Sequence, residues 1–540
     1  IYITDDNPRF ENPKLIRKQI KKGLKKNKYF EISSRAKAIS TAVKELKSGD
    51  ILIVAGKGHE NYQEYKRRRF FSDRSEILKA INEKNLNLSQ SIKTNILREN
   101  YKDIIDKKIY INSASMNSKK INKNSIFIGV KGKNFDGNLY ANEAIKNRAI
   151  LAITNKKFKN PKILFQKNPL NFFNRISKKY RKSLNSNNIV ITGSAGKTSV
   201  KELVGFCLKK LEKTFFSKNS FNNKYGVPLS IFNTPQSAKF TVLEVGMDKK
   251  GEIHSLTNLI KPNLGLITNI SYAHIENFKN LDQIAKAKGE IINNIIPGGT
   301  MIINKDDKFY NYFLIKAKKR NLNVISFSKK NKNANVVLLN HKKYKKNYLM
   351  NFKINNEIKD FLISKDLFDY KENILASLSI ITNYFDPKAL KKNLFSHFKI
   401  PKSRGSLIKY NKGKKKLNII DESYNSNPLS FKFALEKFDR SFKNNKKFLL
   451  IGNMLELGKY SKKLHMRIAN YINNSKVDKV YAYGNLVKHT YNKLKPQIRG
   501  KILSSNMDIL NLINKELPNN CFLMVKGSNS TGLNKIIQSL

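Results

Sequence analysis

The sequence predicts an α/β protein of several domains with a central doubly wound parallel sheet. Short apolar runs alternate with helical stretches along the whole chain, which is the pattern of parallel strands joined by helices. One apolar run, at 188–193, leads through a glycine-bearing turn into an amphipathic helix. At 540 residues the chain is too long for a single hydrophobic core, so we expect about three or four domains.

The first predicted part, 1–82, is a short α/β segment. It contains two β-rich runs, IYIT at 1–4 and ILIVAG at 51–56, with lysine-rich amphipathic segments between and after them. The segment is too short to be a complete nucleotide-binding domain with its own phosphate loop. A polar stretch at 83–98 predicts a linker or a peripheral helix. Because the chain opens with Ile1 rather than Met, we expect a fragment, or a chain whose true start lies upstream.

Three further domains are predicted after this linker. A small α/β domain at 99–187 has its clearest strands at IFIGV (126–130) and AILAIT (149–154). The central domain, 188–398, has four clear strands: NIVITG (188–193), FTVLEVG (240–246), LGLITNI (264–270) and TMIIN (300–304). The pattern then restarts over 399–540, with strands at LNIID (417–421), FLLIG (448–452), KVYAYG (479–484) and CFLMVKG (521–527).

Cysteine content and hydropathy exclude several classes of protein. The two cysteines, Cys207 and Cys521, lie far apart and lack metal-type spacing. They therefore form neither a disulfide framework nor a zinc ribbon, and they fit a reducing compartment. No apolar run of about eighteen residues occurs, which excludes a membrane-spanning helix. We expect a cytoplasmic protein.

The charge balance is extreme, because 105 Lys and Arg residues against 40 Asp and Glu residues give a net charge of +65. Taken alone, this charge would favour binding to nucleic acid or to an anionic membrane. However, the lysines spread through every segment beside abundant Asn and Ile, and Trp does not occur. This composition indicates an A/T-biased codon supply rather than one basic face. We therefore expect no nucleic-acid partner.

The strongest chemical signal is TGSAGKTS at 192–199, between a predicted strand and a predicted helix. Its glycines let the backbone curl so that amide N–H groups face a phosphate chain at a helix N-terminus. Lys197 supplies a point charge for the β- and γ-phosphates, and Thr198 or Ser199 can offer a hydroxyl to Mg²⁺. The loop is shorter than the standard GxxxxGK[ST] form, and the alternative is a Gly-Lys turn with no ligand. The predicted ATP-binding residues of the loop are Gly193, Ser194, Ala195, Gly196, Lys197, Thr198 and Ser199.

A shortened loop of this form is typical of the Mur ligases and of folylpolyglutamate synthase. Further motifs of the chain are similar to those of the Mur ligase family and occur in the family's order: SKNSFNNKYGVPLSIF (217–232), DESYNSNPLSFKFAL (421–435), IGNMLELG (451–458) with His465, and VKGSNS (525–530). The resemblance covers the chain from about residue 99 to the end.

The resemblance implies both a fold and a reaction. The fold would be a small N-terminal domain, a central phosphate-loop domain and a Rossmann-like C-terminal domain. The reaction would be the ATP-dependent addition of D-alanyl-D-alanine to UDP-N-acetylmuramoyl-tripeptide, through an acyl phosphate, in peptidoglycan precursor synthesis. ATP and Mg²⁺ would be the cofactors, and we expect a monomer. Two alternatives stay open: another carboxylate–amine ligase of the same superfamily, or a basic nucleic-acid-binding ATPase.

The resemblance also implies metal-binding and catalytic roles. Glu244, which ends a predicted strand, matches the family's magnesium carboxylate, and a hard divalent cation needs such an oxygen ligand. His274 matches the histidine near a second Mg²⁺. Lys288 matches the lysine that becomes carbamylated, with Lys286 as its competitor in the same helical turn. The predicted metal ligands are Thr198, Glu244, His274 and Lys288, and the predicted catalytic residues are Lys197, His274 and Lys288.

Nucleotide and substrate contacts are carried over in the same way. Arg404 and Gly405 match the pair near the junction of the second and third domains, where we expect a hinge. The match is looser at DYKENILAS around Asn373, and at Asn117-Ser118-Lys119, where the family shows Asp-Ser-Arg. The further predicted ATP contacts are Asn373, Arg404 and Asp421. The predicted substrate contacts are Ser118, Lys119, Asn222, Asn223, Tyr424 and Asn425.

The segment 1–82 resembles the C-terminal domain of a different member of the family, the tripeptide-forming enzyme. Its motifs are TDDNPRFENP (4–13), Arg35 in ISSRAKAI, and AGKGHENYQ (55–63) followed by FSDR. In that member the Asp-Asn-Pro-Arg sequence accompanies meso-diaminopimelate, so Arg9 would pair with its distal carboxylate and Glu60 would hold its amine. The alternative is that DDNPR is only a turn. We interpret the segment as the remnant of a two-enzyme fusion, with a predicted site of Asp6, Asn7, Arg9, Gly56 and Glu60.

Overall fold

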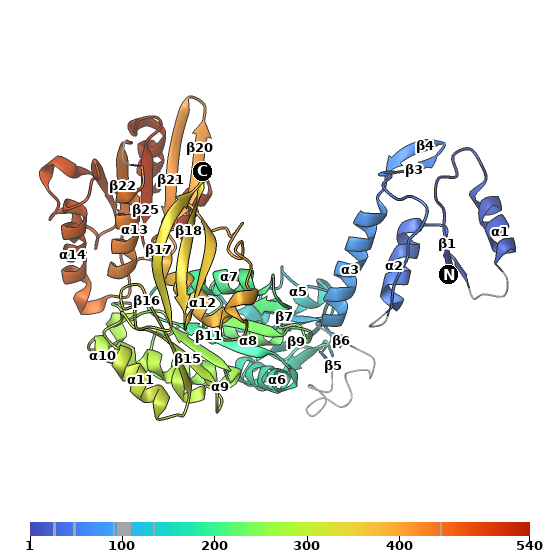
Figure 1. The fold of residues 1–540 in the computed structure, drawn as a ribbon, viewed down its shortest axis with the longest axis horizontal. Coiled ribbons are helices and arrows are strands. Elements are labelled where there is room, and N and C mark those ends of the chain that lie inside the picture. Colours follow the sequence, from blue (N-terminus) through green and yellow to red (C-terminus); the bar gives the residue numbers. More distant parts are fainter. Residues whose placement is uncertain (25–28, 47–49, 90–91, 94–109, 133–134, 443–444) are drawn as a thin grey trace. The chain divides into compact units, whose positions relative to one another are not determined.

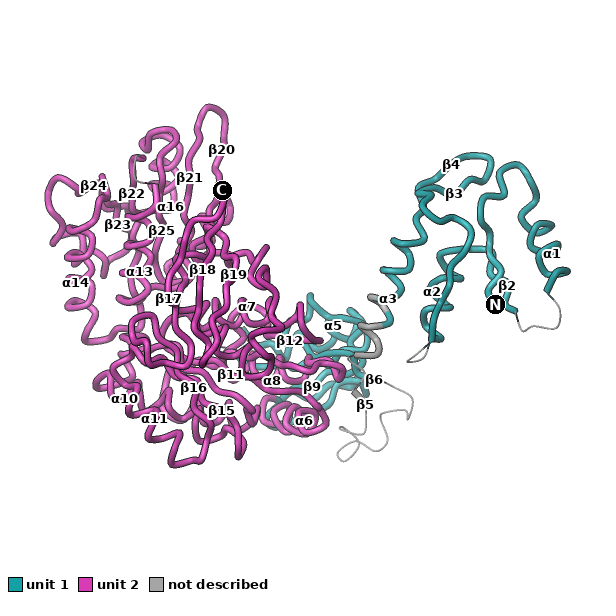
Figure 2. Tube along the Cα trace, viewed as in Figure 1, with its two compact units in different colours: residues 1–169 teal, residues 170–540 magenta. Residues whose placement is uncertain are grey.

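The computed structural model describes residues 1–24, 29–46, 50–89, 92–93, 110–132, 135–442 and 445–540. The chain divides into two compact units, Ile1–Pro169 and Leu170–Leu540 (Figure 2). Within the described residues, no helix is long and apolar enough to cross a membrane.

The first part of unit 1 is a small α/β arrangement. Its elements are β1 (Tyr2–Ile3), α1 (Pro13–Gly23), β2 (Phe30–Glu31), α2 (Arg35–Glu45), β3 (Tyr62–Tyr65), β4 (Arg67–Phe70) and α3 (Asp73–Ser89). β1 pairs with β2 in parallel, and β3 and β4 form an antiparallel hairpin. α2 and α3 pack around a small core of Ile39, Val43 and Ala80. The prediction of a strand at 51–56 is wrong, because this segment forms no strand and pairs with no strand of the described residues.

The second part of unit 1 is a small parallel sheet. An antiparallel pair, β5 (Ile92–Lys93) and β6 (Tyr110–Ile111), precedes this sheet, whose own elements are β7 (Ser113–Ser115), β8 (Ser125–Ile128), α5 (Ala141–Lys146), β9 (Ala149–Thr154) and β10 (Ile163–Phe165). The strand order is β10-β9-β8-β7, and every neighbouring pair is parallel. The predicted strands at 126–130 and 149–154 are confirmed. Much of the predicted linker at 83–98 falls in helix α3, and its residues 90–91 and 94–98 lie outside the described residues.

Unit 2 contains a nine-stranded sheet with the order β12-β13-β11-β14-β15-β16-β17-β18-β19. Its strands are β11 (Asn187–Thr192), β12 (Thr214–Phe216), β13 (Phe240–Glu244), β14 (Leu264–Ile267), β15 (Thr300–Asn304), β16 (Asn323–Ser328), β17 (Val336–Tyr344), β18 (Asn347–Ile354) and β19 (Glu357–Ser364). Pairing is parallel from β12 to β17 and antiparallel through β18 and β19. The predicted parallel strands are confirmed, whereas the antiparallel extension was not predicted.

Helices cover both faces of this sheet, so it is doubly wound as predicted (Figure 1). Met301 and Ile303 of β15 point into a core with one set of helices, and Ile302 points into a core with the other. The first set is α8 (Gly226–Phe232), α9 (Glu252–Ile260), α10 (Leu281–Lys288) and α11 (Tyr310–Lys318). The second set is α7 (Lys197–Leu208) and α12 (Lys371–Ile381). An additional helix, α6 (Pro169–Ser183), packs Phe173 and Tyr180 on Phe232.

The last part of unit 2 is a six-stranded sheet with the order β20-β21-β25-β22-β23-β24. Its strands are β20 (Ser406–Lys412), β21 (Lys415–Glu422), β22 (Lys447–Gly452), β23 (Lys479–Tyr483), β24 (Arg499–Leu503) and β25 (Phe522–Lys526). All pairs are parallel except the β20–β21 hairpin. Its helices are α13 (Pro428–Arg440), α14 (Ser461–Asn473), α15 (Lys488–Tyr491), α16 (Asn506–Asn511) and α17 (Leu533–Gln538). The four predicted strands of this region are confirmed.

Candidate active site

The predicted phosphate loop follows β11 and leads into α7, at the carboxyl end of the parallel sheet. Gly193 adopts φ 142°, and a Cβ there would lie 1.9 Å from Thr268 Oγ1, so only glycine fits. Gly196 adopts φ 84° immediately before the helix. Asn269, just after β14, holds the loop backbone in place, because its Oδ1 accepts a hydrogen bond from the Ala195 amide at 2.9 Å. These contacts hold the turn in the form that a phosphate chain requires at a helix N-terminus.

The first side chains of α7 meet the end of β13. Thr198 Oγ1 donates to Glu244 Oε2 at 2.7 Å, and Asn222 Nδ2 donates to Glu244 Oε1 at 2.6 Å. Glu244 is 1% exposed. Ser199 lies elsewhere, in a pocket with Asn373 and Tyr370. Of the two hydroxyls that the sequence left open, the Thr198 hydroxyl is therefore the one beside the carboxylate.

This oxygen set fits a magnesium ion. Mg²⁺ is normally held by one or two carboxylates, a hydroxyl and the phosphates of its nucleotide, and it keeps several waters. Thr198 and Glu244 supply the hydroxyl and the carboxylate directly next to the phosphate loop. Such a site needs no larger cluster, and none of three or more His, Cys, Asp or Glu residues suited to a metal is found among the described residues.

Lys197 folds back over the loop, and its Nζ donates to Gly193 O at 2.9 Å. Burial lowers the pKa of its ammonium group, which the Glu244 carboxylate partly opposes. Arg404 and Glu456 of the C-terminal region also act on this ammonium group. Lys197 therefore lies near charged groups of both the nine-stranded and the six-stranded part of unit 2.

His274 follows β14 and takes left-handed backbone angles, with φ 58°. Its Nδ1 lies 2.7 Å from Glu456 Oε2 and 3.1 Å from Asp248 Oδ1. Burial on its own would lower the pKa of His274, but the Asp248 and Glu456 carboxylates outweigh burial and raise it. The backbone strengthens the same contact, because the Glu276 amide donates to Glu456 O at 3.2 Å.

The two candidate lysines of α10 lie in different surroundings. Lys286 is exposed, whereas Lys288 is 1% exposed. Burial and, secondly, the nearby charge of Lys197 lower the pKa of Lys288 well below its usual range. Both effects disfavour the charged ammonium form of Lys288. The two lysines therefore differ in burial, and the carbamylation of Lys288 stays a prediction.

A buried lysine supports the asparagine-rich loop 217–223. Lys201 of α7 is 0% exposed, and its Nζ donates to Ser217 O at 2.5 Å and to Asn219 O. The same Nζ lies 2.9 Å from a carboxylate oxygen of Glu202. The loop in turn places Asn222 against Glu244. Lys201 thereby fixes one side of the predicted magnesium site.

The C-terminal region contributes Arg404 to this loop. Arg404 Nη2 donates to Ser220 Oγ at 3.1 Å, and its guanidinium carbon lies 4.3 Å from the centre of the Tyr424 ring. Asp421 is 1% exposed and accepts from Ser403 Oγ at 2.8 Å and from Ser423. Its carboxylate thus supports the turn that presents Arg404.

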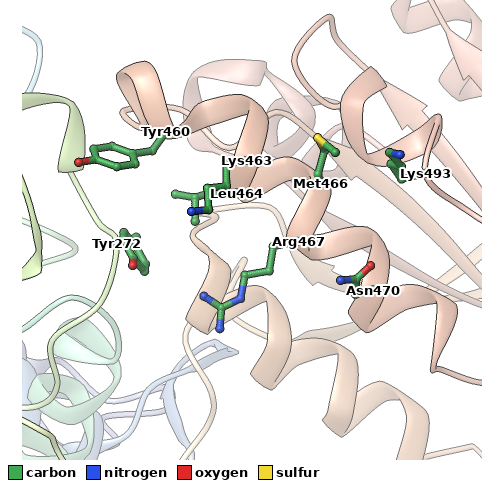
Figure 3. Close-up of a pocket in the computed structure, with 8 residues that line it drawn as sticks. All are labelled: Tyr272, Tyr460, Lys463, Leu464, Met466, Arg467, Asn470 and Lys493. Atoms are coloured by element: carbon green, nitrogen blue, oxygen red, sulfur yellow. The ribbon is translucent and has the colours of Figure 1, made fainter.

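A pocket of about 490 Å³ lies beside this centre (Figure 3). Tyr272 lines one side, and side chains of α14 line the other. Lys463 and Arg467 extend from α14 on the side that faces Tyr272, and Lys493 lies farther along (Figure 3). Three cations in one concave surface suit an anionic part of a substrate.

Comparison with known proteins agrees with this geometry. Residues 191–380 match the Mur ligase middle domain, and residues 1–58 and 408–529 match the Mur ligase glutamate ligase domain. The chain is 30% identical to the UDP-N-acetylmuramoyl-tripeptide--D-alanyl-D-alanine ligase of Rickettsia prowazekii, over 80% of this chain and 96% of the relative. It is 33% identical to the protein of the same name from Buchnera aphidicola subsp. Baizongia pistaciae, over 80% of this chain and 93% of the relative. The chain belongs to the Mur ligase family.

Solved Mur ligase structures have the same fold. The MurF structure from Acinetobacter baumannii matches with a TM-score of 0.70 and 20% identity, covering 84% of this chain and 99% of that one. The MurF ligase of Thermotoga maritima in complex with ADP matches with a TM-score of 0.65 and 24% identity, covering 79% of this chain and 96% of that one. At these identities the likeness shows the fold alone.

Three more predicted contact residues of this Mur ligase have partners within the chain, and their ligand contacts stay predictions. Asn223 Oδ1 accepts from the amides of Tyr225 and Gly226, which supports the turn that leads into α8. Asn425 O accepts from the buried Lys526 at 3.0 Å. Asn373 lies against the phosphate loop, because a Cβ on Gly196 would come within 3.2 Å of its Oδ1.

Two predicted substrate residues lie in unit 1. Ser118 Oγ donates to Glu143 Oε2 at 3.1 Å, and Ser118 is 8% exposed. Lys119 is exposed. Part of the motif GVKGKNFDG beside them, residues 133–134, lies outside the described residues. Their role in binding the uridine nucleotide stays a prediction.

The diaminopimelate-type residues of the N-terminal segment gather around Lys57. Asn7 Nδ2 donates to Glu60 Oε2 at 2.8 Å, and Lys57 Nζ donates to Asn7 Oδ1 at 2.6 Å and lies 3.2 Å from Asp6 Oδ1. A Cβ on Gly56 would lie 3.0 Å from the Asp6 carboxylate. Two motif residues also meet, since Arg35 donates twice to Asp73, each time at 2.7 Å. Arg9 is exposed, with φ 52°.

Sequence reasoning missed four residues of the candidate active site around the phosphate loop and His274. All of them lie in or beside motifs that the sequence had marked, but their partners are distant in the chain: Asp248, Lys201, Ser220 and Glu456. Glu456 stands in the LELG motif and reaches His274, 182 positions earlier (456 − 274). A charged residue inside an apolar motif was the signal that could have found it.

Proposed function

We propose that this Mur ligase joins D-alanyl-D-alanine to UDP-N-acetylmuramoyl-tripeptide in an ATP-dependent reaction, the activity for which its two relatives are named. The observation that carries the proposal is the contact between Thr198 and Glu244 at the mouth of the phosphate loop. It combines an anion-binding helix N-terminus with an oxygen site for the cation that accompanies ATP.

The chain's own residues bind and orient the reactants. The loop amides and Lys197 hold the phosphates of ATP, and Asn373, which lies near Gly196, would contact the nucleotide beyond them. Thr198 and Glu244 would hold Mg²⁺, with His274 and a modified Lys288 at a second ion, and Mg²⁺ when bound neutralises phosphate charge. Arg404 approaches the same centre from the C-terminal region. Catalysis then rests on positioning and electrostatics.

Two steps complete the reaction. An oxygen of the substrate carboxylate bonds to the γ-phosphorus of ATP while the bond from that phosphorus to ADP breaks, which gives an acyl phosphate. The amine of D-alanyl-D-alanine then bonds to the acyl carbon, the carbon–oxygen bond to phosphate breaks, and the amine loses a proton. Lys197 and Arg404 offset the negative charge that develops on the transferring phosphoryl group.

The proposed modification of Lys288 follows from its burial. Its neutral amine can add to carbon dioxide and release a proton, which converts a would-be cation into an anionic carbamate. An anion at this position would be compatible with Lys197 nearby, whereas a second ammonium group is repelled by it. Lys286 lacks this environment, because it is exposed.

We further propose the domain division of 1–82, a linker at 83–98, 99–187, 188–398 and 399–540. In this division 99–187 binds the uridine nucleotide, and 1–82 is a fusion remnant whose Arg9 and Glu60 recognise meso-diaminopimelate. The segment 1–82 contains no phosphate loop, so it catalyses nothing alone. The proposed enzyme works as a monomer in the cytoplasm, where its ATP is available.

Release of ADP tests the proposed function. We expect ADP release to require both UDP-N-acetylmuramoyl-tripeptide and D-alanyl-D-alanine, and the product to have the mass of the pentapeptide nucleotide. Single-stranded DNA replaces the two substrates in a parallel assay. Stimulation by DNA in place of the substrates would instead support the nucleic-acid-binding ATPase.

A further inference from the structure

Tyr370 lies in DYKENILAS, the segment in which the family match is looser, and it directly precedes α12. Its side chain is buried, and the centre of its ring lies 5.4 Å from that of Phe433 on α13. A buried phenol needs a partner for its O–H group. Here the Tyr370 hydroxyl donates to Arg404 O at 3.0 Å. A side chain of the nine-stranded part of unit 2 therefore holds the backbone of Arg404.

The Tyr370 hydroxyl is kept as a hydrogen-bond donor. Lys437 Nζ donates to the phenol oxygen at 3.3 Å, so the phenol proton is left for Arg404 O. Burial, with a smaller effect of the Glu422 carboxylate, raises the pKa of Tyr370 well above its usual range. At neutral pH the phenol therefore keeps the proton that it donates to Arg404.

The turn that Tyr370 contacts has an unusual backbone. Ser403 adopts φ 59° and Gly405 adopts φ 95°, on either side of Arg404. A Cβ on Gly405 would overlap with the Tyr370 hydroxyl oxygen, so only glycine leaves room for the phenol. A non-glycine residue in the left-handed region persists where the surrounding contacts hold it. The hydroxyl of Tyr370 is one such contact, and it fixes the peptide group between Arg404 and Gly405.

The Arg404 side chain leads from this turn to the phosphate loop. Its Nη2 donates to Ser220 Oγ at 3.1 Å, and Ser220 Oγ lies 3.3 Å from Thr198 Oγ1. Thr198 in turn donates to Glu244 at the predicted magnesium site. A shift of the Arg404 backbone would therefore move its guanidinium group relative to the phosphates of a nucleotide.

Tyr370 shares the start of α12 with Asn373. Asn373 lies against the phosphate loop, because a Cβ on Gly196 would come within 3.2 Å of its Oδ1. Tyr370 and Asn373 also line one small pocket together with Ser199 of α7. The start of α12 thus contacts the phosphate loop through Asn373 and the turn of Arg404 through Tyr370.

We propose that Tyr370 is a positioning residue for phosphoryl transfer, whose hydroxyl fixes the backbone of Arg404 so that the guanidinium group meets the γ-phosphate. This role rests on the proposed function, in which Arg404 offsets the charge on the transferring phosphoryl group. Tyr370 acts in it through Arg404. Removal of the hydroxyl should therefore weaken binding of a nucleotide that carries a γ-phosphate and leave binding of ADP unchanged.

Tyr370→Phe in the full chain tests the positioning role, because it removes the hydroxyl and keeps the ring that packs on Phe433. Calorimetry with Mg²⁺ measures the affinities for ADP and for the β,γ-methylene analogue of ATP. We expect the affinity for the analogue to fall at least about fivefold, the effect of one hydrogen bond, and that for ADP to change less than about twofold. The kcat of ligation should also fall at least about fivefold. Equal changes for the two nucleotides, or no change for either, would overturn the proposal.

A double-mutant cycle with Arg404→Ala separates positioning from general support of the fold. In the Arg404→Ala background, Tyr370→Phe should change the affinity for the analogue by less than about twofold. A full effect of Tyr370→Phe in that background would show that the hydroxyl does not act through Arg404.

Tyr410→Phe is the matched control, because Tyr410 is also buried and its hydroxyl donates to Asn514 in the last part of unit 2. It should leave both affinities unchanged. The binding measurements need neither substrate of the ligation. A wild-type chain that binds the analogue but forms no pentapeptide nucleotide would therefore contradict the proposed function, while the affinities still decide the role of Tyr370.

Discussion

Replacing Lys201 with Met tests how the magnesium site is supported. The methionine has a similar length, but it removes the ammonium group that the carbonyl oxygens of Ser217 and Asn219 accept from. A buried acceptor left without its donor costs about 1–3 kcal/mol, so two of them cost about 2–6 kcal/mol. Because the loop 217–223 is partly exposed, water can hydrogen-bond to the freed carbonyl oxygens. We therefore expect the free energy of unfolding to fall by about 2–3 kcal/mol.

The second effect of Lys201→Met should appear at the metal. A displaced loop releases Asn222 from Glu244, and a hydrogen bond to a charged group is worth about 1.5–3 kcal/mol. The Mg²⁺ concentration for half-maximal ATP turnover should therefore rise at least about tenfold. Urea unfolding and a Mg²⁺ titration of turnover measure the two effects.

Lys218→Met is the matched control for this prediction, because Lys218 lies in the same loop and is exposed. It should leave both the free energy of unfolding and the Mg²⁺ dependence unchanged. If Lys201→Met behaves like Lys218→Met in both assays, the supporting role of Lys201 is wrong.

The remaining predictions concern the reacting centre. Lys197→Ala should abolish ligation with an unchanged melting curve, because the γ-phosphate loses its main cation; near-normal turnover would contradict the phosphate-loop assignment. Lys288→Ala should be nearly inactive and partly rescued by added short carboxylates, whereas rescue of Lys286→Ala instead would show that the wrong lysine was chosen. Glu456→Gln tests the raised pKa of His274: the stability that this pair adds should be full below about pH 6.5 and be lost as pH rises through the folded-state pKa. Urea unfolding of wild type and Glu456→Gln across pH 5 to 9 measures this difference, and a pH-independent difference would refute it.

The parallel part of the fold could be predicted because its signal is local. Strands buried on both faces appear as continuous apolar runs, and those at 188–193 and 300–304 fall on β11 and β15. The antiparallel strands β17–β19 were missed because they are half-exposed: β17 is buried only at its first two residues. In a run such as HKKYKKNY the lysines face solvent, so the sequence lacks the continuous apolar signal that predicts a strand. Sequence also predicted a strand at 51–56, which the structure does not contain: this segment pairs with no strand of the described residues.

In the candidate site, too, local features could be predicted from the sequence and contacts between distant residues could not. The phosphate loop is contiguous, so its geometry follows from glycines at fixed spacing. The contacts of Lys201 with the loop 217–223 and of Glu456 with His274 depend on tertiary packing of separate elements. Nothing in one sequence fixes such pairs, and resemblance supplied the roles of Lys288 and His274 only because whole motifs matched. The structure adds that Lys288 is buried and Lys286 exposed, which their sequence positions alone could not show.

The fate of a carboxylate oxygen tests the proposed reaction most directly. The substrate is UDP-N-acetylmuramoyl-tripeptide labelled with ¹⁸O in the carboxylate that is to be joined, and the phosphate and nucleotide products of a single turnover are analysed by mass spectrometry. Transfer of the γ-phosphoryl group to that carboxylate predicts one ¹⁸O atom in inorganic phosphate for each peptide bond formed, with ADP unlabelled. Release of pyrophosphate together with ¹⁸O-labelled AMP, or inorganic phosphate free of ¹⁸O, would contradict the acyl-phosphate account.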